Sequence, residues 1–166
     1  MTVHYKQPVS VLAVIYTTPS PFDTSGGSGQ VEGMTVLLLE RADHPGYWQS
    51  VTGSRDGEET LTETAIREVR EETGLDARQY LLSDWQTQNV YEIYPHWRYR
   101  YQPGITCNTE HVFGFELPGV VTVRLEPREH LNYQWLAWQE AAEKDFSPSN
   151  RAAILELPRR IQTKAR

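Results

Sequence analysis

The part of the sequence that most constrains the fold is a short helix with clear signals at both ends. From Thr60 to Thr73 apolar residues recur at helical spacing, and Thr60 with Glu63 forms the pattern of a capping box. Gly74 follows directly, at the position where a left-handed backbone ends many helices and costs glycine little. We therefore predict one well-delimited helix here.

Apolar runs of strand length lie on both sides of this helix. The expected strands cover residues 8–16, 34–41, 48–52, 80–94, 108–117, 120–125 and 133–136. Two further helices are expected at 138–144 and 149–160, the second with Ser149 as its N-cap. Strands before and after a central helix favour an α+β sandwich, in which helices cover a mixed sheet.

The length of the chain fits one compact domain, since 166 residues are close to the usual size of a single core. The segment 17–33 is rich in Gly, Ser and Pro, and it has too little apolar surface to pack. Its glycines do not form a phosphate-binding P-loop, because no lysine occurs between Lys6 and Lys144. We expect a single domain over 1–166 with a flexible loop insertion at 17–33.

The charge balance excludes some partners. With 16 Lys and Arg against 22 Asp and Glu, the net charge of −6 argues against binding a long nucleic acid, despite the mixed basic and aromatic run at 96–101. The apolar run 9–16 is far shorter than the roughly 20 residues that a membrane-spanning helix needs. Cys107 is the only cysteine, so no internal disulfide can form. We expect a cytoplasmic protein with a small anionic ligand and no membrane contact, as a monomer or a homodimer.

Three glutamates share one face of the predicted helix. Glu68, Glu71 and Glu72 fall within an arc of about 100° at helical spacing. The stripe beside them, which we expect to pack on the sheet, contains Thr62, Ala65, Ile66 and Val69. Each like-charge pair at this spacing costs a helix roughly 0.2–0.5 kcal/mol, and the macrodipole adds a further penalty in the last turn. A solvated acidic face is one interpretation, and a site for Mg²⁺ or Mn²⁺ is the other.

The residues around this helix form a longer pattern with fixed gaps. Gly53 is followed after five residues by Glu59 and after seven more by the run REVREETGL at 67–75. This pattern resembles the Nudix box at each of its defined positions. The resemblance implies a Nudix-type α/β/α sandwich with a mixed sheet and a loop-helix-loop motif. It also implies hydrolysis of a pyrophosphate linkage with Mg²⁺, for which Mn²⁺ can substitute.

The resemblance also implies roles for single residues. Glu68 and Glu72 match the principal metal ligands, and Glu71 matches a further ligand or a group that assists the attacking water. Arg67 matches the arginine that orients these carboxylates, and Gly53 begins the loop that approaches the substrate. Outside the box, Glu129 is the candidate for a further metal ligand or for the general base. An ordinary surface glutamate is the alternative at that position.

Stretches outside the box resemble the folate-pathway branch of the family. They lie at 5–10, 48–54, 98–104, 108–110 and 149–151. This second resemblance implies hydrolysis of dihydroneopterin triphosphate to the monophosphate and pyrophosphate. The substrate-binding residues that it implies are Lys6, Arg41, Thr52, Gly53, Tyr91, Glu92, Ile93, Tyr94 and Ser147.

Simple chemistry agrees in outline with this assignment. Lys6 and Arg41 can neutralise phosphate, and the aromatic rings of Tyr91 and Tyr94 can stack on a planar pterin. Each of these residues also has an ordinary structural interpretation, as an exposed cation or a cross-strand aromatic. A triphosphatase acting on dATP or on modified purine nucleotides remains an alternative, and a non-catalytic Nudix ligand sensor is a third.

Overall fold

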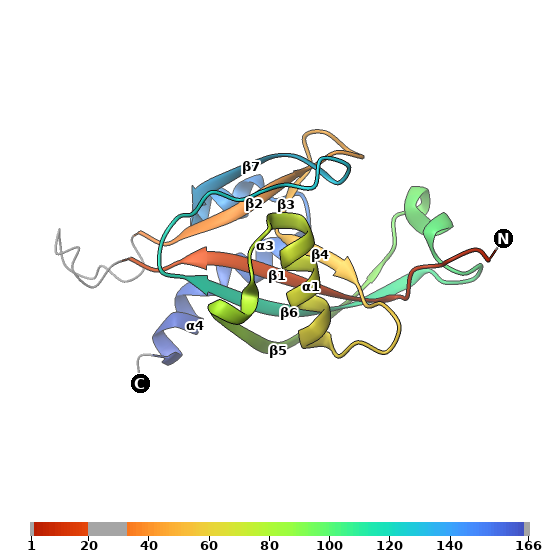
Figure 1. Cartoon of the computed structure of the whole chain (residues 1–166), viewed down its shortest axis with the longest axis horizontal. Coiled ribbons are helices and arrows are strands. Elements are labelled where there is room, and N and C mark those ends of the chain that lie inside the picture. The colour runs from red at the N-terminus through yellow and green to blue at the C-terminus, as the bar shows by residue number, and fades with distance from the viewer. Residues whose placement is uncertain (1, 20–32, 165–166) are drawn as a thin grey trace.

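The computed structural model describes residues 2–19 and 33–164 (Figure 1). The strands are β1 (Val9–Thr17), β2 (Thr35–Arg41), β3 (Trp48–Gln49), β4 (Val51–Ser54), β5 (Leu81–Glu92), β6 (Cys107–Leu117) and β7 (His130–Ala137). The helices are α1 (Leu61–Thr73), α2 (Trp138–Lys144), α3 (Pro148–Leu155) and α4 (Leu157–Lys164), with short 3₁₀ turns η1 (Ala77–Gln79) and η2 (Pro95–Arg100). Thr17 ends β1, and residues 20–32 of the predicted flexible loop lie outside the described residues.

The strands form one mixed sheet that forks along β1. One edge of β1 runs parallel to β6 over its whole length, and β6 pairs in turn with β5 in the antiparallel direction. Along the other edge, the start of β1 pairs with β4 and its end pairs with β2. From there β2 continues to β3 and β7, so the two arms of the sheet separate where β3 gives way to β4.

Helices cover both faces of the sheet, which confirms the predicted α/β/α sandwich (Figure 1). On one face α1 packs its Ala65 and Val69 against alternate residues of β1, β4 and β6. On the other face α2, α3 and α4 cover the remaining residues of β1, β2 and β6. This arrangement follows from the alternation of side chains along a strand, which gives a central strand two buried faces. None of the helices in the described ranges is long and apolar enough to cross a bilayer.

The ends of α1 are those that the sequence predicts. Thr60 caps the helix, and both hydrogen bonds of its capping box with Glu63 are present. Gly74 ends it in the left-handed conformation with φ 76°. One detail of the apolar stripe was wrong: Thr62 is exposed, and Leu61 packs against the core instead.

Three other expectations were wrong. Residues 120–125 form no strand, because the backbone of this segment bonds elsewhere: Arg124 N donates to Thr73 O, and Val121 O accepts from Trp135 Nε1. The helix expected at 149–160 is two helices that meet at Glu156. Its cap is Ser147 rather than Ser149, because Pro148 fits the first helical position, where no N–H is needed.

Candidate active site

A cavity of about 740 Å³ lies at the fork of the sheet. Its wall combines residues of the strands β1 to β6 with residues of α1, η2, α3 and the segment that enters β7. Among the residues that line it are Glu68, Glu72, Glu129 and all the predicted substrate-binding residues, namely Lys6, Arg41, Thr52, Gly53, Tyr91, Glu92, Ile93, Tyr94 and Ser147. Arg67 and Glu71 are not part of the lining.

Two buried carboxylates mark the acidic part of this cavity. Glu68 is 8% exposed and Glu72 is 3% exposed, both on the last two turns of α1. Burial raises the pKa of Glu68 to about 7, against its ion pair with Arg67, and burial raises the pKa of Glu72 well above its usual value. The backbone N–H of Thr52 donates to the Glu72 carboxylate, but Oε2 of Glu72 is buried without a partner in the described structure. Such a group is costly unless something else satisfies it.

Arg67 holds the acidic residues in place. Its Nε and Nη2 donate to the two carboxylate oxygens of Glu59 (2.8 and 2.9 Å), and Nη2 also donates to Ser54 O (2.9 Å). Nη1 donates to Glu68 Oε1 (2.7 Å) and to Glu71 Oε2 (3.2 Å). The guanidinium therefore ties the loop before α1 to the acidic face of the helix. Glu71 is 52% exposed and has this contact with Arg67 on the outer side of the site.

The glycine of the box has a steric reason. A Cβ atom at Gly53 would overlap the carboxylate of Glu68. The φ angle of Gly53 is not in the left-handed region, so the absence of a side chain matters here, rather than backbone freedom. Gly53 thus allows β4 to pass directly against a predicted metal ligand.

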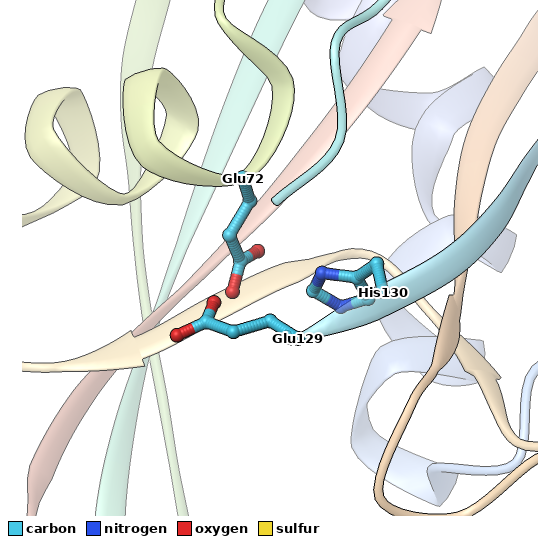
Figure 2. Close-up of side chains that lie close together, drawn as sticks. All are labelled: Glu72, Glu129 and His130. Atoms are coloured by element: carbon cyan, nitrogen blue, oxygen red, sulfur yellow. The ribbon is translucent and has the colours of Figure 1, made fainter. Parts of the chain in front are cut away.

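A third carboxylate approaches from the opposite side. Figure 2 shows Glu72 at the end of α1 pointing toward Glu129, with His130 beside them at the start of β7. One potential ligand atom from each of these three residues lies within 4.8 Å of the others. Burial lowers the pKa of His130 to about 4, so its imidazole is neutral at physiological pH, and its Nδ1 has no hydrogen-bond partner in the described structure. Clustered oxygen donors with an unpartnered buried oxygen fit a hard divalent cation.

Cationic and aromatic groups line a further part of the cavity wall. The guanidinium of Arg41 lies over the ring of Trp97, 4.6 Å from its centroid, and it forms an ion pair with Asp43 (2.7 Å). Asp43 also pairs with Arg100 (3.0 Å), so one aspartate orients two arginines. Loss of solvation and the nearby Arg100 lower the pKa of Lys6. Lys6, Arg41 and Arg100 line the same cavity as the acidic cluster. A ligand that carries both phosphate groups and a bound metal would need cations for the phosphates and acids for the metal.

The predicted wall at 91–94 lies at the end of β5 and just beyond it. The Tyr91 hydroxyl accepts from Asn108 Nδ2 (3.0 Å), and Tyr94 stacks on His96. Glu92 forms an ion pair with Arg98, and Ile93 is buried. The Thr52 hydroxyl donates to Val11 O (2.9 Å), so only its oxygen lone pairs are available to a ligand.

Several residues of the cavity were not predicted as site residues. His130, Asn108, Glu110 and Trp97 all line it. His130 directly follows the predicted Glu129, and Asn108 and Glu110 belong to a stretch that resembles the folate-pathway branch. The sequence marked these stretches, but it gave no means of telling which of their side chains face the cavity.

The comparisons with known proteins agree with this geometry. The model of the NUDIX domain matches residues 24–157, and the chain belongs to the Nudix family. It is therefore a hydrolase that acts on a small phosphorylated molecule.

Several curated relatives carry the same name. The chain is 44% identical to the dihydroneopterin triphosphate diphosphatase of Escherichia coli over 90% of this chain and 91% of the relative. It is 39% identical to the enzyme of that name from Haemophilus influenzae, over 93% of this chain and 89% of the relative. The solved structure of the E. coli dihydroneopterin triphosphate pyrophosphohydrolase matches with a TM-score of 0.76, at 44% identity, over 90% of this chain and 94% of that chain.

Proposed function

We propose that this enzyme hydrolyses dihydroneopterin triphosphate to dihydroneopterin monophosphate and pyrophosphate, with Mg²⁺ as cofactor. The observation that carries the proposal is a cavity whose lining brings together two acids of the Nudix box, cationic side chains that include Lys6 and Arg41, and an aromatic wall. The 39–44% identity to enzymes named for this reaction supports the choice of substrate. We also infer that the whole chain acts as one Nudix domain in the cytoplasm.

Glu68, Glu72 and Glu129 would hold the metal. Two observations support this assignment. Oε2 of Glu72 has no hydrogen-bond partner in the described structure, and Glu129 approaches Glu72 from the opposite side of the site. Bound Mg²⁺, or Mn²⁺ in its place, supplies positive charge that offsets the charge developing on the phosphate oxygens and acidifies the attacking water. The raised pKa values of Glu68 and Glu72 mean that both carboxyl groups must release protons before they can serve as ligands.

The other residues of the acidic cluster would prepare the attack. Arg67 fixes the direction of the Glu68 carboxylate and keeps Glu71 beside it. A water molecule attacks one of the two phosphorus atoms that flank the bridge between the α- and β-phosphates, and the bond from that phosphorus to the bridging oxygen breaks. Glu129 takes the proton of the water and is the better placed of the two candidate bases, because Glu71 lies outside the cavity lining, and the pyrophosphate leaves from the same site.

The rest of the cavity would bind the substrate. Lys6 and Arg41 neutralise the triphosphate, and the stacking of Arg41 on Trp97 limits the motion of its guanidinium. Tyr91 and Tyr94 offer a wall for the pterin ring, with Ser147 at the start of α3 closing the cavity. If the enzyme bound only the metal and the phosphates, at an exposed site without a pocket for the ring, it would have no need of Tyr91, Tyr94 and Ser147 there.

A substrate panel tests this proposal against its alternatives. Dihydroneopterin triphosphate and dATP are incubated separately with enzyme and Mg²⁺, and pyrophosphate and orthophosphate are measured in parallel. We expect fast pyrophosphate release from the pterin compound and slow release from dATP. Fast hydrolysis of dATP with none of the pterin compound would favour a nucleotide triphosphatase, and no hydrolysis of either would favour a ligand sensor.

A further inference from the structure

The cavity has a second polar region, on the sheet face that α1 does not cover. Ser10 of β1 pairs with Glu110 of β6 in the sheet register, and both residues line the cavity. Two residues further along each strand, Leu12 and Val112 pack into the core beneath α2, α3 and α4. Because side chains alternate along a strand, Ser10 and Glu110 face the same side as these helices. The cavity therefore reaches from the acidic cluster of α1 to a buried carboxylate under α3.

Glu110 is an unusual residue for this position. It is 4% exposed, and its Oε1 accepts from Ser149 Oγ at the start of α3 (2.8 Å). Asn89, its partner across the β5–β6 ladder, donates a second hydrogen bond to the carboxylate. Within the described part of the chain no basic side chain forms an ion pair with it. Burial raises its pKa, as expected for a carboxylate that only neutral groups compensate.

The neighbouring Asn108 adds a second acceptor. It is 1% exposed, and its Nδ2 donates to Ser10 Oγ (2.7 Å) and to Tyr91 OH (3.0 Å). Its Oδ1 is buried and has no hydrogen-bond partner in the described structure. Both amide hydrogens of Asn108 are used, whereas its amide oxygen is not. This part of the cavity therefore presents hydrogen-bond acceptors, and a ligand that fits it must supply the donors.

We propose that Glu110 is a specificity-determining residue that binds the 2-aminopyrimidin-4-one edge of the substrate ring. This edge presents a ring N–H beside an amino group, two parallel donors that match the two oxygens of one carboxylate. A carboxylate has about four lone-pair positions, so the bonds from Ser149 and Asn89 leave room for two more. The inference rests on the proposed function, because the phosphates must occupy the acidic end for the ring to reach Glu110.

A carboxylate at this position distinguishes ligand rings by the hydrogen-bond donors that they carry. A pterin and a guanine both carry the paired donors, whereas hypoxanthine lacks the amino group and adenine lacks the ring N–H. A site built to accept hydrogen bonds rejects an analogue without the donors, because its buried acceptors are then left unpaired. We therefore expect the enzyme to prefer pterin and guanine triphosphates to inosine and adenosine triphosphates.

The first test uses the wild-type enzyme. GTP and ITP differ only in the amino group, and their dissociation constants are measured by calorimetry with Ca²⁺ in place of Mg²⁺ to prevent turnover. A hydrogen bond to a charged group corresponds to about a 10- to 100-fold preference for GTP. Equal affinities, within twofold, would overturn the assignment of Glu110 whatever its variants do.

The second test compares two variants on the same strand. Glu110→Gln should raise KM for dihydroneopterin triphosphate about 10- to 100-fold, change kcat less than threefold and bring the GTP-to-ITP affinity ratio close to one. Glu116→Gln is the matched control, on the same face of β6 but outside the cavity lining, and should behave as wild type. If the role of Glu110 were purely structural, Glu110→Gln would instead lower the melting temperature and weaken the binding of GTP and ITP equally. Ser149→Ala would then have the same two effects. That result would overturn the proposal.

The proposed function and the role of Glu110 can fail separately. Wild-type enzyme that does not hydrolyse dihydroneopterin triphosphate but binds GTP better than ITP would refute the proposed function and retain the role of Glu110. Fast hydrolysis of the pterin compound with an unchanged KM in Glu110→Gln would retain the function and refute the role of Glu110.

Discussion

Replacing Arg67 with lysine tests how the metal site is held together. The guanidinium makes five hydrogen bonds, of which four go to the carboxylates of Glu59, Glu68 and Glu71 and one to Ser54 O. A lysine has three donors on one nitrogen and no planar fork, so it cannot keep the paired bonds to Glu59 and also reach Glu68. We expect the variant to lose at least two of the bonds to carboxylates.

The structure gives the size of the effect. A hydrogen bond to a charged group contributes about 1.5–3 kcal/mol, so two lost bonds would cost about 3–6 kcal/mol in a fully buried site. Arg67 is 28% exposed, and its contact with the half-exposed Glu71 is weakened by solvent, so we reduce the expected loss to about 2–4 kcal/mol. The loss should be accompanied by weaker Mg²⁺ binding, because Glu68 is no longer oriented.

The measurement is urea unfolding followed by tryptophan fluorescence, in buffer containing EDTA, together with Mg²⁺ titration of the folded protein. Arg70→Lys is the control, on the same helix with a side chain that is 54% exposed and paired with Asp76, and it should cost less than about 0.5 kcal/mol. If Arg67→Lys matches this control in both stability and Mg²⁺ affinity, the positioning role of Arg67 is refuted.

Three further predictions concern the buried acidic residues and the glycine beside Glu68. Gly53→Ala should reduce kcat at least about 100-fold with a loss of stability under about 1.5 kcal/mol, because the new methyl group displaces the flexible Glu68 carboxylate rather than backbone; a variant with wild-type kcat would contradict this. Glu72→Gln should abolish hydrolysis and raise the melting temperature of the metal-free protein near neutral pH, since it removes the free-energy cost of keeping a buried carboxyl group protonated in the folded state, and a lower melting temperature would speak against that cause. Burial raises the pKa of Glu68 from 4.5 to about 7. It also raises the pKa of Asp145, the buried residue that ends α2, from 3.8 to about 8. The stability that these two groups contribute is therefore complete below about pH 4 and is lost as the pH rises through 7 and 8. Thermal unfolding with EDTA should therefore show a falling melting temperature from pH 5 to 8, with Mg²⁺ restoring it most at the alkaline end; a constant melting temperature would refute the assigned pKa values.

Local signals in the sequence were sufficient for α1 and for the class of the fold. The capping box at Thr60 and the glycine at 74 act over one helical turn, so they can be read without knowing the rest of the structure. The segment 120–125 misled for the opposite reason. Its apolar residues resemble a strand, but they pack beside α1 and Trp135, and this long-range choice is not encoded in the segment itself.

In the candidate site too, some residues could be predicted from local spacing and others depend on long-range packing. The box fixes Glu68, Glu71 and Glu72 by their spacing along one helix, and the structure adds why Gly53 must lack a side chain. Glu110 could not be identified as part of the cavity from the sequence, because its position depends on the register between β1 and β6 and on the docking of α3. His130 could not be identified from the sequence either, because Glu72, which lies beside it in the site, belongs to α1, far away in the chain.

The most direct test of the central claim is ³¹P NMR of dihydroneopterin triphosphate during incubation with the wild-type enzyme and Mg²⁺. The account predicts that the three phosphate resonances of the substrate are replaced by those of a monophosphate ester and pyrophosphate, and that Glu72→Gln leaves the spectrum unchanged. Release of orthophosphate with a diphosphate ester, or turnover by Glu72→Gln at the wild-type rate, would contradict it.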